Sequence, residues 1–133
     1  MRYCADTWFL LQLCQGDETA ERIFRETIDG KSSIVIPTMS ILELIRLSIM
    51  RGGSLSGIDA VLGEMKVVQK IQIISMDEVV AKEAAKVSAS YGISTGDSVI
   101  AATCKLSECD RLLSDDSHLK GQDKKRYLKT ESW

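Results

Sequence analysis

The sequence has no apolar stretch near the roughly 20 residues that a membrane-spanning helix needs. It also lacks the long apolar segment of a secretory signal peptide, because one positive charge near the start is soon followed by the acid Asp6. We therefore expect a chain without a membrane span that stays in the cytoplasm.

Zinc-binding patterns are missing as well. The only histidine is His118, and the four cysteines show no CxxC spacing. A structural zinc site needs closely spaced thiolate or imidazole ligands, so we exclude zinc. Without an export signal, the cysteines are expected to be reduced and to pack as small hydrophobic side chains. They are Cys4, Cys14, Cys104 and Cys109.

The chain has no excess of positive charge. Its 17 basic and 19 acidic residues give a formal charge of −2 and a pI near 5.4. A large basic face for nucleic acid is therefore not indicated. Two local groups of basic residues remain, Arg46 with Arg51 and a C-terminal cluster. Each is either solvated surface charge or compensates the negative charge of nearby acids. The cluster consists of Lys120, Lys124, Lys125, Arg126 and Lys129.

What is present is an ordinary globular composition, with 133 residues, 44% hydrophobic and 27% charged. No repeat, linker or low-complexity segment divides it, so residues 1–133 are expected to form one domain. Short apolar runs predict strands at 2–6, 33–36, 71–74 and 111–114, with a fifth at 126–129. Helical periodicity fills the intervals between them, at 8–11, 17–29, 38–50, 58–70, 77–91 and 97–107.

Helix-boundary residues support this assignment. Asp17 is a candidate N-cap, and Gly30 follows the end of the same helix. Either Thr38 or Ser40 is a plausible N-cap for the third helix, and Gly92 ends the helix over 77–91. Strands that alternate with helices along the whole chain predict an α/β fold with a parallel sheet covered on both faces.

Four acids stand at unusual places in this pattern. Asp6 and Asp116 follow predicted strands, Glu43 interrupts an apolar helix, and Asp97 opens an alanine-rich helix. Parallel α/β sheets form sites beyond the carboxyl ends of their strands, where the strand order reverses. We therefore expect the four carboxylates to meet in one pocket.

Each acid also has a simpler interpretation. Asp6 would cap the following helix, and Glu43 would form an ion pair with Arg46 three residues on. Asp97 would interact favourably with the positive end of the helix dipole. Asp116, or its neighbour Asp115, would cap the next turn. Taken together, however, such acids repel one another unless cations bind them.

Carboxylate oxygens without sulfur or imidazole favour Mg²⁺ or Mn²⁺. Such an ion activates water and offsets charge on a phosphodiester, and two ions about 4 Å apart divide these tasks. Asp6, Asp97 and Asp116 are the predicted metal ligands, and Glu43 would bind a second ion or orient water. The hydroxyls of Thr7 and Ser114 would donate to a ligand carboxylate or to a phosphate.

At these residues the chain resembles PIN-domain proteins, most closely the VapC-type ribonuclease toxins of toxin–antitoxin pairs. The resemblance rests on the strand-Asp-Thr start, the helical Glu43, the Asp97-x-x-Ile-Ala-Ala helix and the Ser114-x-Asp116 segment. Ser114 stands where the family usually has Thr, and the two-residue offset from this hydroxyl favours Asp116 over Asp115 as the fourth acid. The four matching segments are residues 3–7, 40–44, 96–103 and 112–119.

The resemblance implies a three-layer α/β/α sandwich with a central, mostly parallel sheet. It also implies a Mg²⁺- or Mn²⁺-dependent endoribonuclease with Asp6, Glu43, Asp97 and Asp116 as catalytic acids. Thr7, Ser114 and Arg46 are the expected substrate-binding residues. The implied partners are RNA, a second copy of the chain and a small antitoxin that blocks the pocket.

Three alternatives remain open at this point. The chain could be a PIN ribonuclease of RNA maturation or decay, or a PIN module that binds RNA or protein without catalysis. A receiver domain that accepts a phosphoryl group on an aspartate is the third. A receiver needs an acidic pair after its first strand, however, and here that strand ends in the single acid Asp6.

Overall fold

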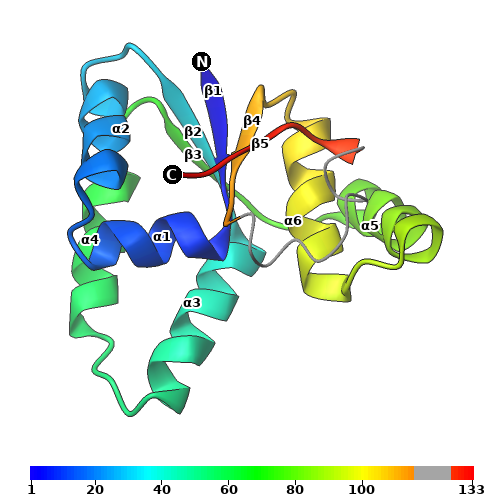
Figure 1. The fold of residues 1–133 in the computed structure, drawn as a ribbon, viewed down its shortest axis with the longest axis horizontal. Helices are drawn as coiled ribbons and strands as arrows, with labels where there is room; N and C mark the ends of the chain where they lie inside the picture. The colour runs from blue at the N-terminus through cyan, green and yellow to red at the C-terminus, as the bar shows by residue number, and fades with distance from the viewer. Residues whose placement is uncertain (116–126) are drawn as a thin grey trace.

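The computed structural model describes residues 1–115 and 127–133. Its centre is a five-stranded sheet in which every pair of neighbours is parallel (Figure 1). The strands are β1 (Arg2–Ala5), β2 (Ser33–Pro37), β3 (Ile71–Ile74), β4 (Arg111–Leu113) and β5 (Thr130–Glu131). The helices are α1 (Thr7–Cys14), α2 (Glu18–Ile28), α3 (Thr38–Met50), α4 (Ser56–Lys66), α5 (Glu78–Tyr91) and α6 (Thr95–Leu106).

The strand order is β3-β2-β1-β4-β5, so the chain builds outward from β1 in one direction and then returns to its other side. The register places Cys4 beside Val35 of β2 and beside Leu112 of β4. Strand order therefore reverses at β1. The carboxyl ends of β1 and β4 form the crevice in which parallel α/β folds place their ligand sites.

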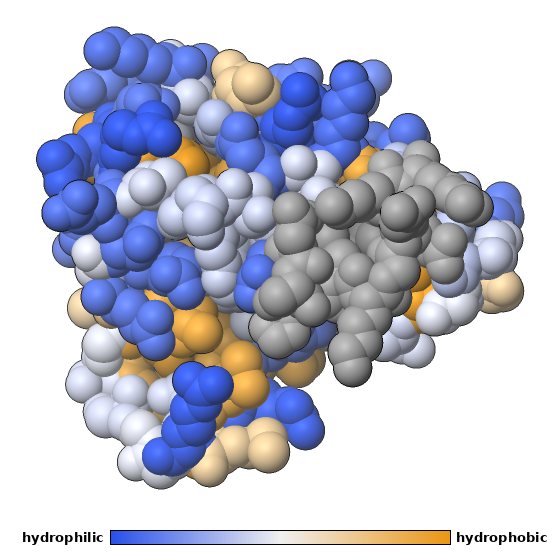
Figure 2. Space-filling model, in the orientation of Figure 1, coloured by the Kyte–Doolittle hydropathy of each residue, from blue (hydrophilic) through white to orange (hydrophobic). Residues whose placement is uncertain are grey.

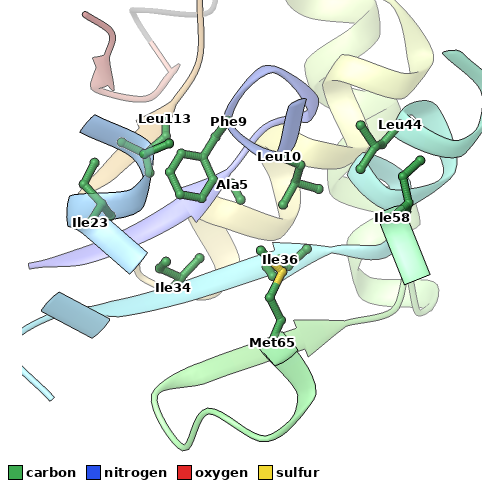
Figure 3. Close-up of a cluster of buried hydrophobic side chains, with 11 residues drawn as sticks. Ala5, Phe9, Leu10, Ile23, Ile34, Ile36, Leu44, Ile58, Met65 and Leu113 are labelled. Atoms are coloured by element: carbon green, nitrogen blue, oxygen red, sulfur yellow. The ribbon is translucent and has the colours of Figure 1, made fainter. Parts of the chain in front are cut away.

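Alternate residues of each strand point to opposite faces of the sheet. On one face, the β2 side chains Ile34 and Ile36 belong to a core with Phe9 of α1 and Met65 of α4 (Figure 3). On the other face, Val35 packs with residues of α6, and α5 packs against α6. Figure 1 shows α1, α2 and α4 on one side of the strands and α5 with α6 on the other. The predicted three-layer α/β/α sandwich is confirmed.

Two predicted helix ends are confirmed by specific groups, whereas α1 is longer than the predicted 8–11 and α4 ends before the predicted residue 70. The Asp17 carboxylate accepts from the Ala20 amide at 3.0 Å, and Gly92 ends α5 in the left-handed region with φ 66°. Ser40 does not cap α3, which begins after Pro37. Its buried hydroxyl instead donates to the Ala5 carbonyl at 2.8 Å and ties α3 to the end of β1.

The fifth strand was predicted too early in the sequence. It is β5 at Thr130–Glu131, where Leu112 and Leu113 of β4 pair with it, whereas residues 127–129 precede the strand. A two-residue edge strand with half-buried side chains has no apolar run by which sequence alone could place it. None of the helices in the described ranges is long and apolar enough to cross a membrane.

The expectation of four reduced cysteines is wrong for one pair. Cys4 of β1 and Cys104 of α6, 100 positions apart, form a disulfide inside the core, whereas Cys14 and Cys109 are free. Spacing in the sequence gave no sign of this pairing. It follows from the packing of α6 against the β1 face that carries Cys4.

The disulfide predicts a thiol count that can be measured. Protein purified without reductant and unfolded in guanidinium should titrate two thiols per chain, and four after reduction. Reduction should also lower the free energy of unfolding by about 2–4 kcal/mol, because it releases a long loop of the unfolded chain. Cys104→Ser is the control and should titrate three thiols with or without reductant. Four thiols in the untreated protein would contradict the bridge.

Candidate active site

Asp6 lies where β1 gives way to α1, and its side chain is buried, with 7% relative exposure. One carboxylate oxygen accepts from the Thr7 amide at 2.8 Å, and the other accepts from the Ser114 hydroxyl at 2.5 Å. The Thr7 bond makes Asp6 the N-cap of α1, as the simpler interpretation predicted. The Ser114 bond crosses from β1 to β4 and orients the same carboxylate at the strand-reversal crevice.

Glu43 reaches this point from the middle of α3. Its Oε2 atom accepts from the Thr7 hydroxyl at 2.8 Å, so a continuous hydrogen-bonded chain runs from Ser114 through Asp6 and Thr7 to Glu43. The predicted alternative, an ion pair between Glu43 and Arg46, is absent from the part of the chain that the structure describes. Arg46 is exposed on the same helix.

Asp97 lies in the first turn of α6, where a negative charge interacts favourably with the helix dipole. The Ser94 hydroxyl donates to its Oδ2 atom at 3.1 Å. The preceding residue, Gly96, lies directly against the carboxylate of Glu43. A methyl group at position 96 would overlap Glu43 Oε1, so the absence of a side chain at Gly96 lets α3 and α6 bring their acids together.

These groups open into one pocket. Three of the four predicted acids line it, together with both predicted hydroxyls, whereas Arg46 does not. Asp116 lies outside the described residues, and its neighbour Asp115 lines the pocket. The lining residues are Asp6, Thr7, Trp8, Leu11, Glu43, Leu47, Arg51, Asp97, Ser114 and Asp115.

Among the pocket residues to which the sequence assigned no site, one is basic and one is aromatic. Arg51 was considered with Arg46 as a possible counterweight to the acids, but only the structure shows that Arg51 is the one at the pocket. It directly follows α3, two helical turns beyond Glu43. Trp8 begins the apolar segment predicted as a helix over 8–11, and it is half-buried and lines the pocket directly after the Asp6-Thr7 pair.

The donor chemistry of this pocket suits a hard cation, because carboxylate and hydroxyl oxygens line it and no sulfur or imidazole does among the described lining residues. Within residues 1–115 and 127–133, however, no three acidic, histidine or cysteine side chains are grouped closely enough to hold one ion. The acids thus share a pocket without forming a compact metal cage among the described residues.

Covalent catalysis by a thiol has no support here. Burial raises the pKa of the Cys109 thiol to about 11, so this cysteine is neutral at pH 7 and is not an activated nucleophile. The other free cysteine, Cys14, does not line the acidic pocket. Among the described residues, the polar groups that line the pocket are carboxylates, hydroxyls and the Arg51 guanidinium.

Fold and site together define a class: a parallel α/β domain with an acidic pocket at the crevice where strand order reverses. The profile of the PIN domain matches residues 3–125, so the chain belongs to the PIN-domain family. No curated protein matched the chain in a comparison by sequence.

Solved structures share this fold at low sequence identity. A chain of VapBC2 from Rickettsia felis, solved bound to a DNA fragment from their promoter, superposes with a TM-score of 0.71 at 14% identity and covers 100% of this chain and 99% of that one. VapBC-1 from nontypeable Haemophilus influenzae gives 0.70 at 16% identity, with 100% and 98% covered. VapC20 of Mycobacterium tuberculosis, described as a sarcin-ricin loop cleaving toxin, gives 0.65 at 15% identity, with 90% and 95% covered.

The contact between Gly96 and Glu43 makes a specific prediction. Gly96→Ala should displace the Glu43 carboxylate from Thr7 and lower any activity of the pocket about 100-fold, as a misplacement near 1 Å does. Stability should change by no more than about 1 kcal/mol, because alanine gains helix propensity and the atom that its methyl group meets is the far end of the flexible Glu43 side chain.

Gly57→Ala is the matched control, since Gly57 is likewise the second residue of a helix and has open space around it. Activity and thermal unfolding should be measured for both variants. Equal activity in the two would show that the position of Glu43 does not matter to the pocket.

Proposed function

We propose that this protein is a metal-dependent endoribonuclease and the toxin component of a VapBC-type toxin–antitoxin pair. The observation that carries the proposal is the meeting of Asp6, Glu43 and Asp97, from three distant segments, in one pocket at the strand-reversal crevice. Membership of the PIN-domain family and a fold shared with VapC proteins support the same function.

The roles follow from the contacts. Asp6, Asp97 and Asp116 would hold Mg²⁺ or Mn²⁺. When bound, such an ion lowers the pKa of its water ligand and offsets the negative charge of the phosphodiester. Ser114 and Thr7 donate to Asp6 and Glu43, and so fix which carboxylate oxygens remain to face the pocket. Glu43, held by Thr7, would orient the attacking water or bind a second ion.

Arg51 takes the substrate-binding role that the sequence assigned to Arg46. It is the one arginine that lines the pocket in the described part of the chain, and a guanidinium group suits contact with a phosphate. Thr7 and Ser114 were predicted to donate either to a ligand carboxylate or to a phosphate, and in this structure their hydroxyls donate to Glu43 and Asp6.

The direct test incubates purified protein with structured RNA and either Mg²⁺ or Mn²⁺. Cleavage is expected with either ion, and it should stop in EDTA and in Asp6→Asn or Asp97→Asn. Asparagine keeps the oxygen that accepts from Thr7, so Asp6→Asn should unfold within a few degrees of the parent protein. Cleavage that survives EDTA or both substitutions would refute the metal mechanism.

The two arginines of this region offer a matched comparison. Arg51→Ala should raise KM for RNA several-fold and reduce the slope of log affinity against log salt by about 0.7, the value for one phosphate contact on a single strand. Arg46→Ala, which removes an exposed arginine outside the pocket, should change neither quantity. Cleavage rates measured over a series of salt concentrations give KM and the salt slope for each variant. Equal effects of the two substitutions would show that Arg51 does not contact the substrate.

The expected antitoxin would bind beside the pocket. An apolar groove between α1, α3 and α4 shares Leu11, Leu47 and Arg51 with the acidic pocket and continues to Leu44 and Ile58. Figure 2 shows an apolar surface gathered over this region. A partner segment with apolar anchors in the groove and a basic side chain at the acids would block access. A second copy of the chain and a cytoplasmic location complete the proposal.

The other PIN functions are separated by genetics. An overlapping upstream reading frame for a small DNA-binding protein would support the toxin assignment, and an isolated gene would favour RNA maturation or decay. A non-catalytic module has no need for Ser114, Thr7 and Gly96 to arrange Asp6 and Glu43 in this way. The receiver alternative is set aside by the match to the PIN-domain family.

A further inference from the structure

Trp8 is the feature of the pocket that the catalytic roles do not use. It lies in the first turn of α1, two residues after Asp6, and it is half-buried. It lines the acidic pocket together with Leu11, which is three residues further on and so lies on the same face of the helix. The next residue, Phe9, is fully buried in the core. Trp8 thus stays partly exposed beside the carboxylates, whereas its neighbour Phe9 is enclosed by the core.

The indole ring is held in place from one side. Trp133 packs against it with ring centroids 4.7 Å apart and an interplanar angle of 51°. Trp133 is itself fixed, because it contacts Phe9 edge to face at 6.3 Å and its indole N–H donates to Asp17 at 2.8 Å. The position of Trp8 is thus set by contacts outside the pocket, and a ligand does not have to order it.

A rigid aromatic ring beside a phosphodiester site has a clear use. The acids of the pocket repel the phosphates of a nucleic acid, so binding needs an attraction that does not depend on charge. Stacking of a base on an aromatic side chain supplies it, and every base has a face that can stack. Arg51 adds one positive charge at the same pocket.

We propose that Trp8 stacks an unpaired nucleobase of the RNA next to the phosphodiester in the acidic pocket. Such a base has to be exposed on one face, as in a single strand or a loop, and not enclosed in a continuous duplex. In a duplex both faces of each base are covered by neighbouring pairs. This inference rests on the proposed ribonuclease function and specifies its substrate.

The kinetic test compares a single strand with the same sequence in a duplex. The parent protein should cleave the single strand at least tenfold faster. Trp8→Ala should lower kcat/KM on the single strand about 10- to 100-fold, the range expected for the loss of one stacked base, whereas Trp8→Phe should stay within about threefold. Loss of the strand preference in Trp8→Ala is also expected.

Tyr91→Ala is the matched control. Tyr91 is also a half-buried aromatic residue in a tilted pair, with Tyr127 at 6.0 Å, but it does not line the pocket. Its removal should leave the strand preference unchanged. If Trp8→Ala and Tyr91→Ala lose the same activity while the parent protein cleaves RNA, the stacking role is refuted and the nuclease function stands.

A binding measurement decides the question without turnover, and without requiring Trp8→Ala to fold. In Trp133→Phe combined with Asp97→Asn, Trp8 is the only tryptophan. A short oligoribonucleotide should quench its fluorescence with saturation, and an abasic oligomer of equal length should not. Equal quenching by both, or none by either, overturns the proposal. Absence of RNA cleavage by the parent protein counts separately against the nuclease function.

Discussion

The site depends on a buried carboxylate that is bound on both of its oxygens. Asp6 receives the Thr7 amide and the Ser114 hydroxyl, at 2.8 and 2.5 Å, and these donors come from the ends of two adjacent parallel strands. A buried acid without such donors would be costly. The same two hydrogen bonds that offset the cost of burying Asp6 also fix the orientation of its carboxylate. Thr7 connects this carboxylate to that of Glu43.

The arrangement spreads from Asp6 through short side chains. Thr7 uses its amide for Asp6 and its hydroxyl for Glu43, so one residue joins β1 to α3. Gly96 then allows α6 to approach Glu43, which brings Asp97 to the same opening. Hydrogen-bond donors and one missing side chain, rather than large packing surfaces, thus align acids from three segments of the chain. Such a site is sensitive to single atoms, and its geometry is set before any substrate arrives.

Sequence could predict the parts that local rules control. Helical period, caps such as Asp17 and terminators such as Gly92 gave the element order, and strand ends gave the pocket at Asp6 and Ser114. It failed where tertiary approach decides. Sequence did not show that Arg51, and not Arg46, lines the pocket, or that Trp8 lies at the pocket whereas its neighbour Phe9 is buried in the core. It did not show the Cys4–Cys104 disulfide either, because that bond depends on how α6 packs on β1. Asp116 lies outside the described residues.

The negative charge of the pocket gives its apolar lining residues, Trp8, Leu11 and Leu47, a role in ligand binding under the proposed function. Carboxylates suited to a divalent cation repel the phosphodiester that the cation would serve, and the whole chain carries a formal charge of −2. Long-range attraction of the proposed RNA substrate would therefore be weak, and its selection would have to come from short-range contacts at the opening of the pocket. Arg51 offers one charged contact and Trp8 one aromatic face, and the groove past Leu11 and Leu47 offers an apolar surface to a protein partner. Because substrate and partner would approach over the same few residues, a segment seated in that groove needs only one basic side chain to occupy the pocket in place of RNA.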